Sequence, residues 1–195
     1  MSLYTEIQSD VFIWTNRKTM VLETDMAIRA AIRKAHRAAS FYRDLQTVSV
    51  PVSTAASVQT VDLSASCPLY RQLYTVKPTT PAGAVQYEDA DVRDLLDADG
   101  FLKYNVYWVV GTTLSIRPSV AYDSVDITYY KRVDVDDLNT LDDWIATEHK
   151  DLIVLWAAAN ILAIVGEQEV KTRVEGLAKM AYDDLIGDSM EIIGR

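Results

Sequence analysis

The chain contains few histidines and cysteines, two of the residue types that most often take part in nucleophilic or redox chemistry. It has two histidines, His36 and His149, and one cysteine, Cys67, and the three lie in different segments. There is no Gly-x-Ser-x-Gly sequence, and the histidines are not at the spacing of metal ligands. A single cysteine also excludes a disulfide framework and a cysteine-based zinc site. We therefore expect both histidines to be ordinary surface or helix-end residues, and nothing in the sequence indicates an enzyme.

Acidic residues gather in two segments, 88–99 and 134–151. Carboxylate oxygens are the ligands that divalent cations such as Ca²⁺ take in proteins. The two segments lack the alternating ligand spacing of a calcium-binding loop, and the chain has no glycine-rich phosphate-binding loop. We expect these acids to be solvated or to lie at an interface, and we expect no cofactor and no metal.

Basic residues are concentrated only between residues 25 and 43, where Arg29, Arg33 and Arg37 recur at helical spacing. One interpretation is a solvated helix face whose arginines lay their aliphatic stems along the surface. The other is a surface for an acidic protein partner or for passing DNA. The whole chain has a net charge of −9 and a pI near 4.7, which argues against a general nucleic-acid binder. An acidic protein can still guide DNA through a channel, because acidic walls do not bind the phosphates.

The most apolar stretch of the chain, residues 152–165, predicts a helix that is apolar on nearly every face. It is shorter than the ~20 residues that a membrane span needs. We therefore expect a buried central helix, covered either by its own chain or partly by another subunit. The small residues that follow Trp156 allow close backbone approach, which makes Ala157, Ala158 and Ile161 candidates for a subunit interface.

The remaining elements predict an α+β fold. Helical spacing predicts helices over residues 3–15 and 25–43, with a cap at 23–25, and a last helix that begins near 167 and ends at Gly187. Its inward stripe includes Leu177. Between them, alternating residues predict a sheet of five or six mostly antiparallel strands, with a short acidic helix over 88–97. We expect a helical bundle made from residues 1–45 and 134–195, and a β-rich insertion over residues 46–133.

Both ends of the chain allow a further expectation. The N-terminus has no basic segment followed by an apolar one, so we expect no signal peptide, no membrane anchor and a soluble protein from a reducing compartment. At the other end, Met190, Ile192 and Ile193 follow the predicted end of the last helix. Three large apolar side chains with no cover of their own predict contact with a partner.

Two segments resemble the head–tail adaptor proteins of tailed bacteriophages, also called connector or head completion proteins. Residues 107–118 form a strand, a glycine turn and a strand that ends in proline, and residues 125–130 form a strand that ends in two tyrosines. The sequence from Trp144 into the alanine-rich helix is similar to the helical C-terminal half of that family. The order of elements matches over most of the chain, whereas residues 48–81 match nothing in the family.

The resemblance implies a homo-oligomeric ring, usually of twelve copies, bound under the portal protein of the virion. The ring would extend the DNA channel, pass genomic DNA without sequence-specific binding and dock a tail or nozzle protein, with no membrane involved. Family members hold the portal with extended C-terminal segments, which implies that Met190, Ile192 and Ile193 contact the portal or a neighbour. Such a protein is made in the host cytoplasm and resides at the head–tail interface. We expect the loops at 64–68 and 78–83 to face the tail. The alternative is a monomeric or dimeric module that binds a ligand or protein with its sheet face.

Overall fold

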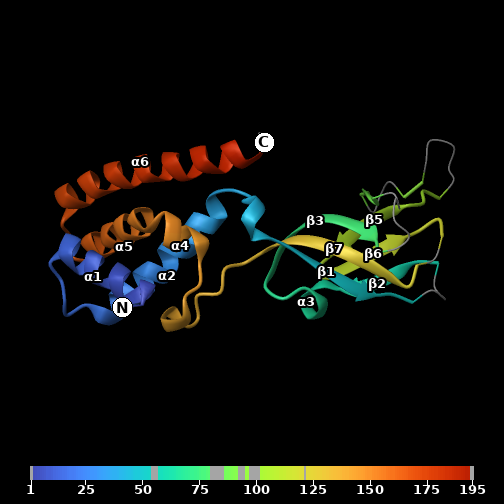
Figure 1. The fold of residues 1–195 in the computed structure, drawn as a ribbon, viewed down its shortest axis with the longest axis horizontal. Helices are drawn as coiled ribbons and strands as arrows, with labels where there is room; N and C mark the ends of the chain where they lie inside the picture. Colours follow the sequence, from blue (N-terminus) through green and yellow to red (C-terminus); the bar gives the residue numbers. More distant parts are fainter. Residues whose placement is uncertain are drawn as a thin grey trace. The chain divides into compact units, whose positions relative to one another are not determined.

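The computed structural model describes residues 2–53, 57–79, 86–91, 95–96, 102–120 and 122–193, with side chains as far as Asp188. The chain divides into a helical unit, residues 1–42 and 133–195, and a β unit, residues 43–132 (Figure 1). Both ends of the chain therefore build one unit, and the middle of the chain builds the other. This confirms the α+β class, and the division lies close to the predicted boundaries.

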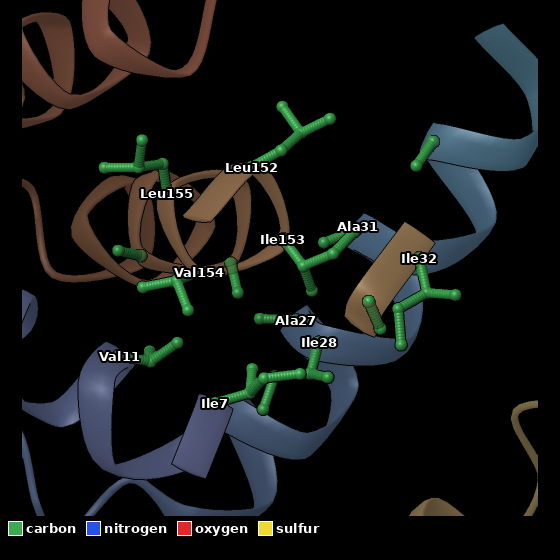
Figure 2. Close-up of a cluster of buried hydrophobic side chains, with 14 of the residues drawn as sticks. Ile7, Val11, Ala27, Ile28, Ala31, Ile32, Leu152, Ile153, Val154 and Leu155 are labelled. Carbon is green, nitrogen blue, oxygen red and sulfur yellow. The ribbon is translucent and has the colours of Figure 1, made fainter. Parts of the chain in front are cut away.

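The helical unit is built around α5, Lys150–Ile164. Its neighbours are α1 (Leu3–Thr15), α2 (Val21–Ala38), the short α4 (Trp144–Glu148) and α6 (Gln168–Ile193). Figure 2 shows side chains from α1 and α2 gathered beside Ile153 and Val154 of α5; they include Ile7, Val11, Ala27, Ile28 and Ala31, and Ile32 belongs to the same buried cluster. Burying a large aliphatic side chain contributes about 1.5–3 kcal/mol, so this cluster holds the two ends of the chain together. None of the described helices is both long and apolar enough to cross a membrane.

The helix starts and ends differ in part from the sequence prediction. α2 begins at Val21, so the predicted cap at 23–25 lies inside its first turns. Asp25 instead joins α2 to α1, because its carboxylate accepts hydrogen bonds from Tyr4 (2.5 Å) and Gln8 (3.0 Å). Gly166 follows α5 with φ 79°, a left-handed conformation that glycine adopts without strain, as expected for a residue that ends a helix.

The prediction that the last helix ends at Gly187 is wrong, because α6 continues to Ile193. Gly187 does not adopt a left-handed conformation. A glycine inside a helix costs only about 0.5–1 kcal/mol relative to alanine, and no proline follows to prevent the next turn. One glycine without a left-handed turn is too weak a signal to end a helix.

The β unit contains two sheets rather than the single sheet that alternation predicted. In one, β1 (Leu45–Pro51) and β3 (Tyr70–Pro78) flank β7 (Ser124–Lys131), all antiparallel. The other has the order β2-β6-β5-β4, with bounds Gln59–Asp62, Thr113–Arg117, Val106–Val110 and Glu88–Asp89. Side chains from both sheets share one core, which includes Leu114, Ile116, Val125, Ile127 and Tyr129.

The predicted acidic helix over 88–97 is also wrong where it is described. Glu88 and Asp89 form β4, which pairs in parallel with Val106 and Tyr107 of β5. Residues 92–94 and 97 of that prediction lie outside the described residues. Two short helical segments remain. One is α3 (Leu63–Ser66) in the β unit, and the other is a 3-10 turn at Tyr42–Asp44, where the chain passes from the helical unit to the β unit. Another 3-10 turn, Leu138–Thr140, precedes α4 in the helical unit.

The position of Ile153 in the core leads to a stability prediction. Ile153→Ala is expected to lower the free energy of unfolding of the helical unit by about 2–5 kcal/mol, because it removes a fully buried side chain and leaves a cavity. Ile164→Ala on the same helix is the matched control, since Ile164 is 63% exposed, and it is expected to change the free energy by less than about 0.5 kcal/mol. Urea denaturation followed by circular dichroism measures both. Equal effects of the two substitutions would contradict this description of the core.

Candidate functional site

The predicted basic surface on α2 is only partly available to a partner. The Arg29 guanidinium donates hydrogen bonds to the backbone carbonyls of Val135 and Asp136, so Arg29 fastens the segment after the β unit to α2. Arg33 lies 3.6 Å from the Asp136 carboxylate, which is 91% exposed, and such a solvated ion pair contributes little. Arg37 is exposed, and no carboxylate among the described residues lies within ion-pairing distance of it. Arg33 and Arg37 can therefore bind an outside group, whereas Arg29 has a structural role.

A groove with an aromatic floor runs beside these arginines. Arg33, Lys34 and Arg37 of α2 line it together with Trp156 of α5 and Tyr182 of α6, and its volume is about 670 Å³. The Lys34 ammonium lies 4.0 Å from the centre of the Trp156 ring, and the Trp156 and Tyr182 rings are 5.9 Å apart. A cation over an indole face is stabilised by the negative potential of the ring. The groove is positively charged and suits acidic side chains of a partner.

An acidic hollow of about 680 Å³ lies between the start of α5 and the second half of α6. Its carboxylates come from Glu148, Asp151, Asp183, Asp184 and Asp188. The hollow also contains two basic side chains, Lys150 and His149, and each lies beside one carboxylate. Lys150 forms an ion pair with Asp10 at 2.9 Å, and the hydrogen bond to Asp10 raises the pKa of Lys150, while His149 lies 3.8 Å from Asp188. The acidic charge of the hollow is therefore only partly balanced.

The basic groove and the acidic hollow adjoin different sides of α6. Asp184 follows Tyr182 by two positions, which places it about 200° away around the helix at ~100° per residue. The acids before α5 form a cluster that is visible in the sequence. Asp183, Asp184 and Asp188 are not visible as part of it, because their proximity to residues 148–151 arises only when α6 packs on α5.

The prediction that Ala157, Ala158 and Ile161 form a subunit interface is wrong. All three are fully buried within the helical unit of a single copy. The chain's own α1, α2 and α6 cover α5, so no face of these residues is left for a neighbour. The run of small residues serves close packing inside the unit.

Large apolar side chains instead remain exposed on the helices that cover α5. On α2, Leu22 is 75% exposed and Met26 is 71% exposed. On α6, Met180 is 66% exposed, and Leu177, which was predicted to face inward, is 41% exposed. Sequence periodicity assigned Leu177 to the core because it lies next to the true inward stripe of Val174, Ala178 and Leu185.

His36 was expected to be a surface or helix-end residue; it lies in the last turn of α2, but it is not at the surface. His36 and Asp143 are almost fully buried, and the His36 Nε2 atom lies 2.6 Å from an Asp143 carboxylate oxygen. The other Asp143 oxygen accepts a hydrogen bond from the Ala146 backbone amide at 2.7 Å, which caps the start of α4. The Phe41 and Trp144 rings contact His36 edge-on. This cluster joins the end of α2 to the start of α4.

A histidine–aspartate pair also occurs in nucleophilic catalysis, where it requires a hydroxyl or thiol beside the imidazole. The contacts described for His36 are the Asp143 carboxylate and the Phe41 and Trp144 rings. Cys67 is buried, and desolvation raises the pKa of its thiol, which disfavours the reactive thiolate. Among the described residues, no group of His, Cys, Asp and Glu is arranged to hold a metal ion.

The predicted contact residues at the C-terminus lie in the last turns of α6, within the helix that ends at Ile193. The side chains of Met190, Ile192 and Ile193 lie outside the described part of the structure. In the β unit, residues 64–66 of the first predicted contact loop form α3, and Pro78 ends β3. Residues 80–83 of the second loop are outside the described residues.

No family model matches the chain, and no match was found among curated proteins. The adaptor resemblance therefore rests on the order and spacing of the residues quoted above.

Asp143 offers a direct test of the buried cluster. Asp143→Ala is expected to lower the free energy of unfolding by about 2–4 kcal/mol, because it removes a helix cap and the buried carboxylate oxygen that lies 2.6 Å from the His36 Nε2 atom. Asp143→Asn is the matched control, since the amide oxygen of asparagine can still cap the Ala146 amide while its amide nitrogen can donate to an unprotonated Nε2 of His36; its cost is expected to be below about 1.5 kcal/mol. Thermal and urea denaturation measure both variants. A neutral effect of Asp143→Ala would show that the cluster does not hold α2 to α4.

Proposed function

We propose that this protein is a structural adaptor of a phage virion, which forms a ring under the portal, extends the DNA channel and docks the tail. The observation that carries the proposal is the nature of the outer faces of α2 and α6. Both helices already bury one face in the helical unit, yet they expose large apolar side chains beside charged ones. Such patches on a folded unit are typical of protein–protein contact sites.

The number of these surfaces supports a closed assembly. A chain that carries two different contact surfaces on different helices binds its neighbours head to tail, and a head-to-tail contact closes into a ring when its rotation allows. The family resemblance proposes twelve copies, with the portal as the platform. The fold of the helical unit, built from both ends of the chain around an inserted β unit, agrees with the order of elements in that family.

The charge of the chain supports a role beside DNA rather than on it. A net charge of −9 gives walls that form few ion pairs with phosphates, so that genomic DNA can pass without binding. The last turns of α6, with Met190, Ile192 and Ile193, are proposed to contact the portal or a neighbouring copy. The β unit, including residues 64–68 and 78–83, is proposed to face the tail or nozzle protein.

One feature of the β unit favours the alternative function, a small ligand- or protein-binding module. Tyr70, Tyr107 and Trp108 line a hollow of about 480 Å³ together with Asp89 and Asp91. Aromatic walls with acidic groups suit a cationic or amphipathic ligand. A module of this kind would act without a ring, so the size of the assembly separates the two functions.

Native mass spectrometry with the portal protein of the same virus tests the adaptor function. The intact chain is expected to occupy the portal as a complete ring, with one adaptor copy for each portal subunit. A chain that does not bind the portal and stays a monomer or dimer at every concentration would contradict the proposal and favour the module.

The same experiment tests the role of the last turns of α6. A chain that ends at Ile186 is expected to occupy the portal less fully and to dissociate at lower salt, because it lacks the apolar residues of the C-terminus. Unchanged occupancy would show that the end of α6 does not grip the portal, while the ring itself could still form through other surfaces.

A further inference from the structure

We propose that the outer face of α2 in one copy binds the outer face of α6 in the next copy, with the apolar ends together and the basic end against the acidic end. The inference deepens the proposed function, because it names the contact that would join neighbours in the ring. The contact itself is defined by residues of the helical unit alone.

The outer stripe of α2 changes from apolar to basic along the helix. Met26, Arg33 and Arg37 follow one another at intervals of seven and four residues, and Leu22 lies one turn before Met26. At ~100° per residue these four side chains lie within a narrow band on the side opposite the buried face. All four residues are exposed.

The outer stripe of α6 changes from apolar to acidic in the same direction. Leu177, Asp184 and Asp188 follow one another at the same intervals of seven and four residues, and Met180 lies between the first two. These residues are exposed and form one band of the helix. The band borders the acidic hollow and lies away from Tyr182, which belongs to the basic groove.

The two stripes are complementary only when the helices run in the same direction. Met26 then meets Leu177, while Arg33 faces Asp184 and Arg37 faces Asp188, at ~10 Å and ~16 Å along the helices from the apolar contact. Reversing one helix would place arginines against Met180 and Leu177 and leave the charges unmatched. Charge pairing therefore fixes the direction of docking, and the apolar contact supplies surface that leaves water.

One copy has both stripes free for its neighbours. Among the described residues, no ion pair joins the arginines of α2 to the aspartates of α6 within the chain. The groups that face the stripes are Asp136 beside Arg33 and His149 beside Asp188, both at long ion-pair distances of 3.6 and 3.8 Å. The stripes belong to different helices, so a copy can use α2 toward one neighbour and α6 toward the other, as a ring requires.

Disulfide trapping between two differently tagged populations of the full chain tests the contact. One population carries Met26→Cys and the other Leu177→Cys, and native Cys67 is buried. After mild oxidation at low ionic strength, the mixed dimer is expected to exceed both same-population dimers. Lys179→Cys replaces Leu177→Cys in the matched control, since Lys179 is exposed on α6 about 200° away from Leu177.

Reversing the charges of the two stripes in the same trapping experiment tests whether the ion pairs direct the contact. Arg33→Glu with Arg37→Glu in the Met26→Cys population is expected to lower the yield of mixed dimer roughly tenfold, which corresponds to about 1.4 kcal/mol. Asp184→Arg with Asp188→Arg in the other population is expected to restore it. A yield equal to the Lys179→Cys control, or a reversed pair that restores nothing, would overturn the contact.

The outcome is separable from that of the adaptor function. If the intact chain rings the portal but trapping fails, the α2–α6 contact is wrong and the adaptor function stands. If trapping succeeds and the portal is not bound, the chain associates with itself through these faces without being an adaptor.

Discussion

The burial of α5 is the constraint on which the helical unit depends. A helix that is apolar all round has no face to leave in water, so it needs cover on every side. α1 and α2 from the beginning of the chain, and α4 and α6 from its end, supply that cover. The two ends of the chain must therefore meet, and the residues between them must leave the helical unit and return. The β unit satisfies this requirement by folding around a core of its own.

The same constraint determines which surfaces face outward. Because Ala157, Ala158 and Ala159 of α5 are buried by its own chain, they offer nothing to another molecule, and the faces available to a neighbour belong mainly to the covering helices. α2 and α6 each bury one face in the core and carry exposed apolar and charged residues on another face. The acidic hollow and the basic groove arise where α6 meets α5 and α2. The same two helices therefore form the core with one face and are proposed to contact neighbours with another.

Much of the fold was predictable because periodicity reports local burial. Helix α1 and strands β6 and β7 match their predicted segments, and the inserted β unit was expected from the alternating residues between the predicted helices. Periodicity does not report which strands pair, so the two sheets were predicted as one. It also does not report what covers an apolar helix, so Ala157, Ala158 and Ile161 were assigned to a neighbour. His36 and Asp143 are far apart in sequence, and no local pattern indicates that they meet. Helix α6 ran past its predicted end because one glycine is a weak stop signal.

Hydrogen–deuterium exchange on the free and the assembled chain tests the central claim most directly, namely that α5 is covered by its own chain and that neighbours contact the covering helices. The amides of α5 are expected to be protected in the free chain and unchanged on assembly, because their cover is internal. New protection is expected around residues 22–37 of α2 and 177–188 of α6. Slow exchange of α5 that appears only on assembly would contradict the account, as would new protection confined to the β unit.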